Sequence, residues 1–360
     1  MSTGPRSDAT QGATLCYSNG VFSRFSGAER PFHGWWSRGY LENRMWCQSQ
    51  PPYVCCLIEA EMDNTRRLLN VERVCQKYNL GSYRKLAEDS LFKHPPAPQY
   101  SVFYMDRLHN ISYCPVYKSG TTTWLYNLCL LMNVTVKMLN NGREQLSTIA
   151  RRAIPELEYP EAERVLNASR RLLVVRHPFE RLLSAYRDKL ENSVAGREHG
   201  TLHFYRKYGA KIVKKYRGNN FTKPRSDQVI RRDDIPSPAG VEPTFREFVD
   251  YVIDTDLGSY GDDHWMPYYL YCTPCLVKYS IIANVESLWR DQVYAINKLG
   301  LRDKIKPRWR HSNGHVNASK IYFRQLNKAT VRKLHEKLRL DFELFNYSPD
   351  IYYEYATFAD

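Results

Sequence analysis

Residues 111–124 read Ile-Ser-Tyr-Cys-Pro-Val-Tyr-Lys-Ser-Gly-Thr-Thr-Thr-Trp, and the pattern of this stretch indicates the fold class. The run Ile111–Val116 is strand-like, and a turn of small residues follows it. A helix is predicted after the turn, from about Thr122 to Met132. A strand that leads through a tight turn into a helix is the repeating unit of α/β proteins.

The same order of elements occurs twice more along the chain. Leu172–Val175 is a continuous apolar run of the kind found in parallel sheets, and it leads into a predicted helix, Pro178–Glu191, with proline in its first turn. A third predicted strand, Val277–Val285, precedes a predicted helix, Ser287–Leu299. We therefore expect an α/β fold with a P-loop-like parallel sheet flanked by helices.

The chain divides by composition into four parts. Residues 1–60 look poorly organised, and residues 61–99 contain a stem-like helix and the stiff, Pro-rich linker His94–Pro98, which no helix could cross. Residues 100–350 hold the alternating strands and helices, so they are the predicted main domain. Residues 351–360 are a C-terminal tail.

The turn after the first strand has the features of an anion-binding loop. A helix N-terminus presents unpaired backbone N–H groups and partial positive charge, and a lysine adds a full charge. It is not a Walker A loop, because its lysine precedes a single glycine instead of following a second one. An ordinary strand–turn–helix junction is the alternative interpretation. The candidate residues are Lys118, Ser119, Gly120, Thr121, Thr122 and Thr123.

A second candidate site follows the second strand. Arg176 stands at the end of this strand, and Ser184 lies about two helical turns further on. Arginine offers a planar fork suited to phosphate oxygens, and ligands of open α/β sheets bind at the carboxyl ends of strands. The two loops could therefore face one ligand with two anionic ends. The neighbouring Arg187, Asp188 and Lys189 could be only charge pairs on a solvated helix.

The net charge is +14, from 52 Lys and Arg against 38 Asp and Glu, which favours polyanionic partners without choosing among them. A basic stretch with interleaved tyrosines could bind an anionic glycan, although a solvated helix face explains it equally well. Its candidate binding residues are Arg206, Lys207, Lys211 and Lys214.

The nine cysteines form no regular framework, and their odd number leaves at least one thiol without a partner in the chain. Cys272 and Cys275 form a lone CxxC pair, which we interpret as structural or disulfide-forming because no further ligands are spaced for zinc. No metal site is therefore expected. Six Asn-x-Ser/Thr sequons favour a secretory lumen: Asn110, Asn133, Asn167, Asn220, Asn317 and Asn346.

The two candidate loops resemble the 5'-phosphosulfate loop and the 3'-phosphate motif of sulfotransferases that use 3'-phosphoadenosine 5'-phosphosulfate (PAPS). The second loop is close to the pattern of the Golgi carbohydrate sulfotransferases, which include the chondroitin, dermatan and N-acetylgalactosamine 4-O-sulfotransferases. The resemblance covers about residues 62–347. It continues in Thr244–Val249, Asp263–Pro267, Cys272–Cys275 and Asp341–Tyr347.

The resemblance implies a sulfotransferase fold and transfer of a sulfuryl group from PAPS to a sugar hydroxyl, without a metal. It implies that Lys118 contacts the bridging and leaving oxygens, that the loop to Thr123 binds the 5'-phosphosulfate, and that Arg176 and Ser184 bind the 3'-phosphate. It also implies a Golgi type II membrane protein, whereas no apolar run in this sequence approaches the roughly 20 residues of a membrane helix. Three features depart from the family pattern: Tyr117, Gly120-Thr121-Thr122 and His177.

The acceptor hydroxyl needs a general base, and we expect His264 to supply it. A structural histidine beside Trp265 is an equal alternative, and Asp263 and Glu180 are weaker candidates. The expected partner is an anionic or neutral glycan, not a nucleic acid. Competing interpretations are a P-loop kinase, a non-enzymatic polyanion-binding protein on the same fold, and a sulfotransferase with a non-carbohydrate acceptor.

Overall fold

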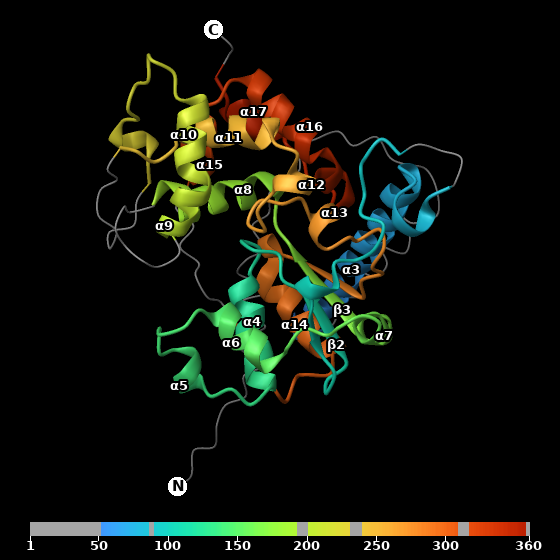
Figure 1. Ribbon diagram of the computed structural model, residues 1–360. Helices are drawn as coiled ribbons and strands as arrows, with labels where there is room; N and C mark the ends of the chain where they lie inside the picture. Colours follow the sequence, from blue (N-terminus) through green and yellow to red (C-terminus); the bar gives the residue numbers. More distant parts are fainter. Residues whose placement is uncertain (1–51, 86–89, 193–200, 231–239, 309–316, 358–360) are drawn as a thin grey trace.

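The computed structural model describes residues 52–85, 90–192, 201–230, 240–308 and 317–357 (Figure 1). Most of the segment predicted to be poorly organised, residues 1–51, lies outside these ranges. The sheet has four strands in the order β1-β2-β3-β4: Tyr104–Asp106, Ile111–Cys114, Arg170–Val175 and Ile281–Asn284. Strands β2, β3 and β4 are parallel and β1 is antiparallel, so the predicted α/β class with a mainly parallel sheet is confirmed.

Each predicted strand–helix pair is present, with small shifts at the ends. Helix α4 (Thr121–Leu131) follows β2, and α14 (Leu288–Lys298) follows β4. The helix after β3 is α only over α8 (Pro178–Tyr186) and then widens into a π-helical turn, η3 (Arg187–Glu191). Strand β4 is shorter than predicted because the Val277 N–H bonds to the Thr273 carbonyl in a turn before it.

Some of the remaining helical elements cover the sheet, and the others pack together beside it. The α-helices are α3 (Pro52–Lys77), α5 (Val136–Leu139), α6 (Leu146–Ala153), α7 (Glu161–Ala168), α9 (Thr201–Phe204), α10 (Ala210–Tyr216), α11 (Phe245–Asp254), α12 (Leu257–Tyr260), α13 (Tyr268–Tyr271), α15 (Ala318–Phe323), α16 (Lys328–Leu344) and α17 (Asp350–Tyr355). A second π-helical turn is η4 (Tyr205–Gly209), and 3-10 turns are η1 (Gly81–Tyr83), η2 (Tyr100–Val102), η5 (Ser226–Gln228) and η6 (Val285–Ser287).

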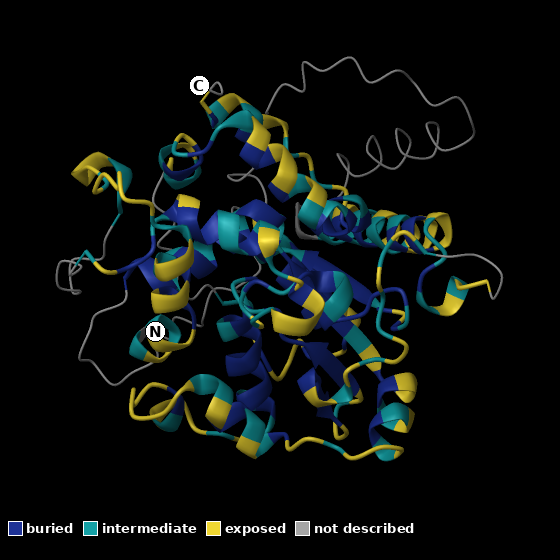
Figure 2. Ribbon diagram, turned by 45° about the horizontal axis from the view of Figure 1, so that its top comes forward, coloured by how far each residue is buried: buried dark blue, intermediate teal, exposed yellow. Residues whose placement is uncertain are grey.

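Helices cover both faces of the sheet, which explains the continuous apolar run of β3. Leu172 and Val174 pack toward α4, α6 and α14, whereas Leu173 and Val175 pack toward α3, α7 and α13, and all four are fully buried. A third core joins α8, α10, α11, α15, α16 and α17, which gather at the top of Figure 1. Figure 2 shows the strands in dark blue and the outer helix faces in yellow.

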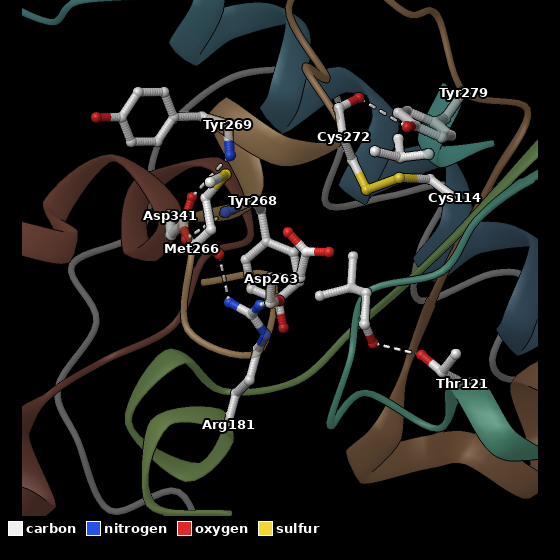
Figure 3. The surroundings of a disulfide bond; sticks show 12 residues. Cys114, Thr121, Arg181, Asp263, Met266, Tyr268, Tyr269, Cys272, Tyr279 and Asp341 are labelled. Atoms are coloured by element: carbon white, nitrogen blue, oxygen red, sulfur yellow. Dashed lines mark hydrogen bonds between the residues drawn. A yellow bond between two sulfur atoms is a disulfide. The ribbon is translucent and has the colours of Figure 1, made fainter. Parts of the chain in front are cut away.

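Two disulfides tie the loop that contains the CxxC pair to β2 and to α3. Cys272 bonds to Cys114 at the end of β2 (Figure 3), and Cys275 bonds to Cys75 of α3. The disulfide-forming interpretation of Cys272 and Cys275 is confirmed, and it leaves neither thiolate for zinc. Within the described ranges Cys129 is free and buried.

No group of His, Cys, Asp and Glu side chains within the described ranges is arranged to hold a metal ion. None of the helices that the structure describes is both long and apolar enough to cross a membrane.

Candidate active site

The loop between β2 and α4 is a tight turn with two residues in the left-handed region. Lys118 has φ 68° and Gly120 has φ 75°, and such a value is uncommon for a lysine. The Ser119 N–H and the Thr121 hydroxyl both donate to the Val116 carbonyl, at 3.1 and 2.5 Å. These bonds close the turn and aim the start of α4 at the carboxyl edge of the sheet.

The first turn of α4 leaves a set of amides for an anion. Among the described residues, no protein partner bonds the N–H groups of Gly120, Thr121 and Thr122, as expected for a helix N-terminus. Thr122 is partly exposed, whereas the hydroxyls of Ser119 and Thr121 already bond inside the protein. The loop therefore presents backbone donors more than hydroxyl donors, together with the Lys118 side chain.

Arg176 lies beside this loop, as the sequence predicts. It follows β3, and its guanidinium lies 3.4 Å from the Lys118 carbonyl and 3.5 Å from a carboxylate oxygen of Glu180. Ser184 is partly buried on α8, about two turns beyond Arg176. The two predicted anion-binding segments are thus neighbours at the carboxyl ends of β2 and β3.

One buried hydroxyl joins these two segments. Tyr268 accepts the Arg176 N–H at 2.8 Å, donates to the Arg176 carbonyl at 2.9 Å, and lies 2.9 Å from the Ser119 hydroxyl. Burial raises the pKa of Tyr268 to about 12, so the hydroxyl keeps its proton. Tyr268 carried no signal in the sequence, because its partners are distant along the chain.

Arg181 fixes a third segment against the loop. This buried guanidinium donates to the carbonyls of Tyr117, Met266 and Asp263, at 3.0, 2.7 and 3.0 Å (Figure 3). It therefore places the segment around His264 next to the residue that precedes Lys118.

His264 is held on three sides. Its ring stacks on Tyr117 with 4.5 Å between centroids, and Phe204 meets it edge-on at 5.0 Å. Its Nδ1 lies 2.7 Å from Oδ1 of Asp262. Burial lowers the pKa of His264, and the nearby charges of Lys189 and Lys118 act in the same direction, whereas Asp262 opposes them.

Asp262 defines the tautomer of this ring. Burial alone would raise the pKa of Asp262, but the hydrogen bonds from His264 and Tyr208 lower it, so the carboxylate is ionised. An ionised carboxylate accepts the Nδ1 proton and leaves the Nε2 lone pair of the neutral imidazole available. A neutral histidine in this form can take a proton from a hydroxyl.

The other candidates for a base are placed differently. Glu180 is engaged by the Ser319 hydroxyl, by Arg176, and by the Tyr352 hydroxyl at 2.8 Å, so it bridges α8, α15 and α17. The Asp263 side chain is exposed. Trp265 is buried against Tyr208 at 4.9 Å, on the core side of the segment.

Two further charged residues of the candidate site, Asp188 and Lys189, lie on the π-helical turn η3, and the sequence did not place them here. Lys118 Nζ is 3.1 Å from Asp188 Oδ2, and Lys189 Nζ is 3.2 Å from the same oxygen. The sequence pattern suggested only solvated charge pairs, because a helix that widens after Tyr186 shifts the residues on each face.

The basic stretch begins beside this centre and runs outward along η4 and α10. Lys207 lies 3.7 Å from Asp262, and the Tyr208 hydroxyl donates to Asp262 at 2.9 Å. All four predicted glycan-binding residues are exposed: Arg206, Lys207, Lys211 and Lys214. Arg217 instead bonds Glu247 at 2.8 Å and is structural.

Residues 101–348 match the model of the sulfotransferase family, and the chain belongs to this family. It is similar to carbohydrate sulfotransferase 11 of Rattus norvegicus, with 28% identity over 68% of this chain and 66% of the relative. Carbohydrate sulfotransferase 8 of Mus musculus is 28% identical over 77% of this chain and 62% of the relative. Carbohydrate sulfotransferase 14 of Mus musculus is 30% identical over 65% of this chain and 57% of the relative.

The chain thus spans slightly less than two thirds of the length of these relatives. No solved structure gave a significant match. The family implies that the protein uses a sulfonate donor.

Proposed function

We propose that the protein is a PAPS-dependent carbohydrate O-sulfotransferase, which moves a sulfuryl group onto a hydroxyl of a glycan. One observation carries the proposal: the α4 amides, Arg176 and the Asp262–His264 pair meet at the carboxyl edge of the sheet. Two anion-binding positions and a base are what transfer from a bisphosphorylated donor requires.

The donor would lie across the two loops. Its 5'-phosphosulfate would bind the open amides of Gly120, Thr121 and Thr122, and its 3'-phosphate would bind Arg176 and Ser184. Lys118 would neutralise the negative charge that grows on the leaving oxygen during in-line displacement. A basic loop without a metal suits this chemistry, because the backbone and lysine supply the charge.

His264 would act as the general base. Its Nε2 would take the proton of the acceptor hydroxyl, the acceptor oxygen would bond to sulfur, and the bond from sulfur to the phosphate oxygen would break. Adenosine 3',5'-bisphosphate would leave with that electron pair. Asp262 supports the step because its charge stabilises the imidazolium that forms.

The acceptor is proposed to be a glycan or glycosaminoglycan. The names of the relatives support a carbohydrate acceptor. The exposed cations that run from Lys207 to Lys214 support an anionic one, since they continue outward from the base. The disulfides and sequons favour an oxidising lumen, and the family resemblance supports the Golgi lumen and a membrane anchor.

A thermal-shift assay tests the proposal most directly. A ligand that binds only the folded state raises Tm, so adenosine 3',5'-bisphosphate should raise it and adenosine 5'-phosphate should raise it little. Sulfate transfer to chondroitin, dermatan and N-acetylgalactosamine glycans would then identify the acceptor. If neither nucleotide shifts Tm of well-folded protein, the donor site is refuted, and a non-enzymatic polyanion-binding role takes its place.

A further inference from the structure

The two cations that we propose bind the donor, Lys118 and Arg176, each form an ion pair with a carboxylate of the same helical stretch. Lys118 Nζ lies 3.1 Å from Asp188, and Arg176 lies 3.5 Å from Glu180. Glu180 belongs to α8, and Asp188 belongs to the π-helical turn that continues it. Carboxylate oxygens therefore neutralise the two cations that sulfate and phosphate oxygens of a donor would otherwise neutralise.

Glu180 and Asp188 differ in the other side chains that contact them. Glu180 is fixed by Ser319 and Tyr352, which belong to other helices. Asp188 shares its Oδ2 with a second lysine, Lys189, at 3.2 Å. The side chains of Lys118, Asp188 and Lys189 are each about one fifth to one quarter exposed, so they have room to move. Asp188 can thus release one lysine and keep the other.

We propose that Asp188 is a positioning residue that holds Lys118 in an ion pair until the donor binds, and then keeps its ion pair with Lys189. This inference rests on the proposed function. The exchange would free Lys118 for the leaving oxygen of the donor. It would also keep the charge of Asp188 balanced, so that the carboxylate does not repel the sulfuryl group.

Asp188 also supports the charged form of Lys118. Burial lowers the pKa of Lys118, the charges of Lys189 and Arg176 lower it further, and Asp188 raises it. His264, whose own pKa is lowered partly by the charge of Lys118, is a further titratable group near the lysine. Removing the Asp188 charge should therefore deprotonate Lys118 at a lower pH.

The test compares Asp188→Asn with the wild type and with a control, Asp227→Asn, which loses the same charge from an exposed pair with Arg225. Calorimetric titration with adenosine 3',5'-bisphosphate at neutral pH should show about fivefold tighter binding by Asp188→Asn, because no ion pair must break. The alkaline limb of its kcat/KM profile for PAPS, which reports the free enzyme, should move to lower pH. Asp227→Asn should match the wild type in both measurements.

Unchanged or weaker binding by folded Asp188→Asn, with an unmoved alkaline limb, would overturn the inference and leave Asp188 a structural role. If that variant does not fold, Lys189→Met replaces it. It should bind the bisphosphate more weakly, since Asp188 then has no lysine left, and wild-type affinity would overturn the inference. A wild-type protein that does not bind the bisphosphate would instead refute the proposed function.

Discussion

Oδ1 of Asp262 lies 2.7 Å from Nδ1 of His264 and 3.1 Å from its backbone nitrogen, so one carboxylate oxygen fixes both the ring and the main chain. The other carboxylate oxygen accepts from the Tyr208 hydroxyl at 2.9 Å. The ring is thereby oriented by a segment that also carries the exposed lysines of η4 and α10. Its position next to Lys118 depends on Arg181, which ties Asp263 to Tyr117.

Replacement of His264 should separate catalysis from donor binding. His264→Ala should lower kcat by about 10²–10⁴-fold, the usual contribution of a general base. Binding of adenosine 3',5'-bisphosphate should stay close to wild type, because the ring contributes no donor contact. Turnover assays and thermal shift measure the two effects, and a His264→Ala protein with full turnover would remove His264 from the mechanism.

The pH profile of activity should identify the same pair. A base works in its neutral form, and burial lowers the pKa of His264 below its ordinary value of 6.5, so the acid limb should lie below pH 6.5. Asp262→Asn removes a charge that favours the imidazolium, so the limb should move to still lower pH and kcat should fall. An unmoved limb with a lower kcat would mean that Asp262 orients the ring without setting its pKa, and would contradict the predicted effect of its charge.

Tyr268 should matter for donor binding more than its burial alone suggests. Tyr268→Phe keeps the ring but leaves the Arg176 main-chain groups without their partner, which should cost about 1–3 kcal/mol of unfolding free energy. The loop of Ser119 would also lose its link to Arg176. We expect weaker binding of adenosine 3',5'-bisphosphate, measured by titration calorimetry.

Tyr279→Phe is the matched control for this variant. Its buried hydroxyl donates to the Cys272 carbonyl at 2.8 Å, away from both anion-binding segments (Figure 3). It should lose comparable stability and retain donor affinity. Equal losses of affinity in the two variants would show that Tyr268 contributes only through stability.

The sheet and the position of the two candidate loops at its edge were predictable because they depend on local pattern. The four buried residues of β3 are apolar without a break, since helices cover both faces, and proline at the start of α8 marks its N-terminus. Lys118 and Arg176 could be placed at this edge because Lys118 lies in the turn after β2 and Arg176 directly follows β3. β1 was missed because it has only three residues and pairs by a short antiparallel turn.

Residues that work through distant contacts left no such pattern. Arg181 resembles a surface arginine of an amphipathic helix, yet it is buried and bonds three carbonyls far along the chain. Tyr268 stands in a run of tyrosines with no polar neighbour to mark its hydroxyl. The spacing of an α-helix could not predict the contact between Asp188 and Lys118, because the helix changes to π geometry at Arg187.

The exposure of the sequons predicts which of them carry N-linked glycans. All six acceptor asparagines are exposed, so each could hold a glycan in the folded protein. In the sequons of Asn133 and Asn220 the threonine is exposed as well. In those of Asn110 and Asn167 the serines, Ser112 and Ser169, are buried and bond each other at 2.6 Å.

We therefore expect glycans at Asn133 and Asn220 when the chain passes through a secretory lumen, and lower occupancy at Asn110 and Asn167. Digestion with an N-glycosidase should lower the apparent mass, and Asn133→Gln and Asn220→Gln should each remove one step. Asn110→Gln is the comparison. A mass that digestion leaves unchanged would contradict both the glycans and the lumenal location.

His177 occupies the position where the family pattern usually has an aspartate, and it still caps α8. Its Nδ1 accepts the Phe179 N–H at 3.2 Å, and its Nε2 donates to the Ser348 carbonyl at 2.9 Å. The bond from Phe179 needs the neutral ring, because a protonated Nδ1 cannot accept, whereas a protonated ring would still donate to Ser348. Loss of the cap in His177→Ala should cost about 1 kcal/mol or more of unfolding free energy, measured by denaturant titration.

The same ring should make stability sensitive to acid. Burial lowers the pKa of His177 below 6.5, so its contribution to stability is present above pH 6.5 and is lost as pH falls through the folded-state pKa. Asparagine caps helices well but does not titrate, so His177→Asn should lose less stability than the wild type between pH 7 and pH 5. Parallel slopes for the two proteins would mean that protonation elsewhere, His264 included, accounts for the acid sensitivity.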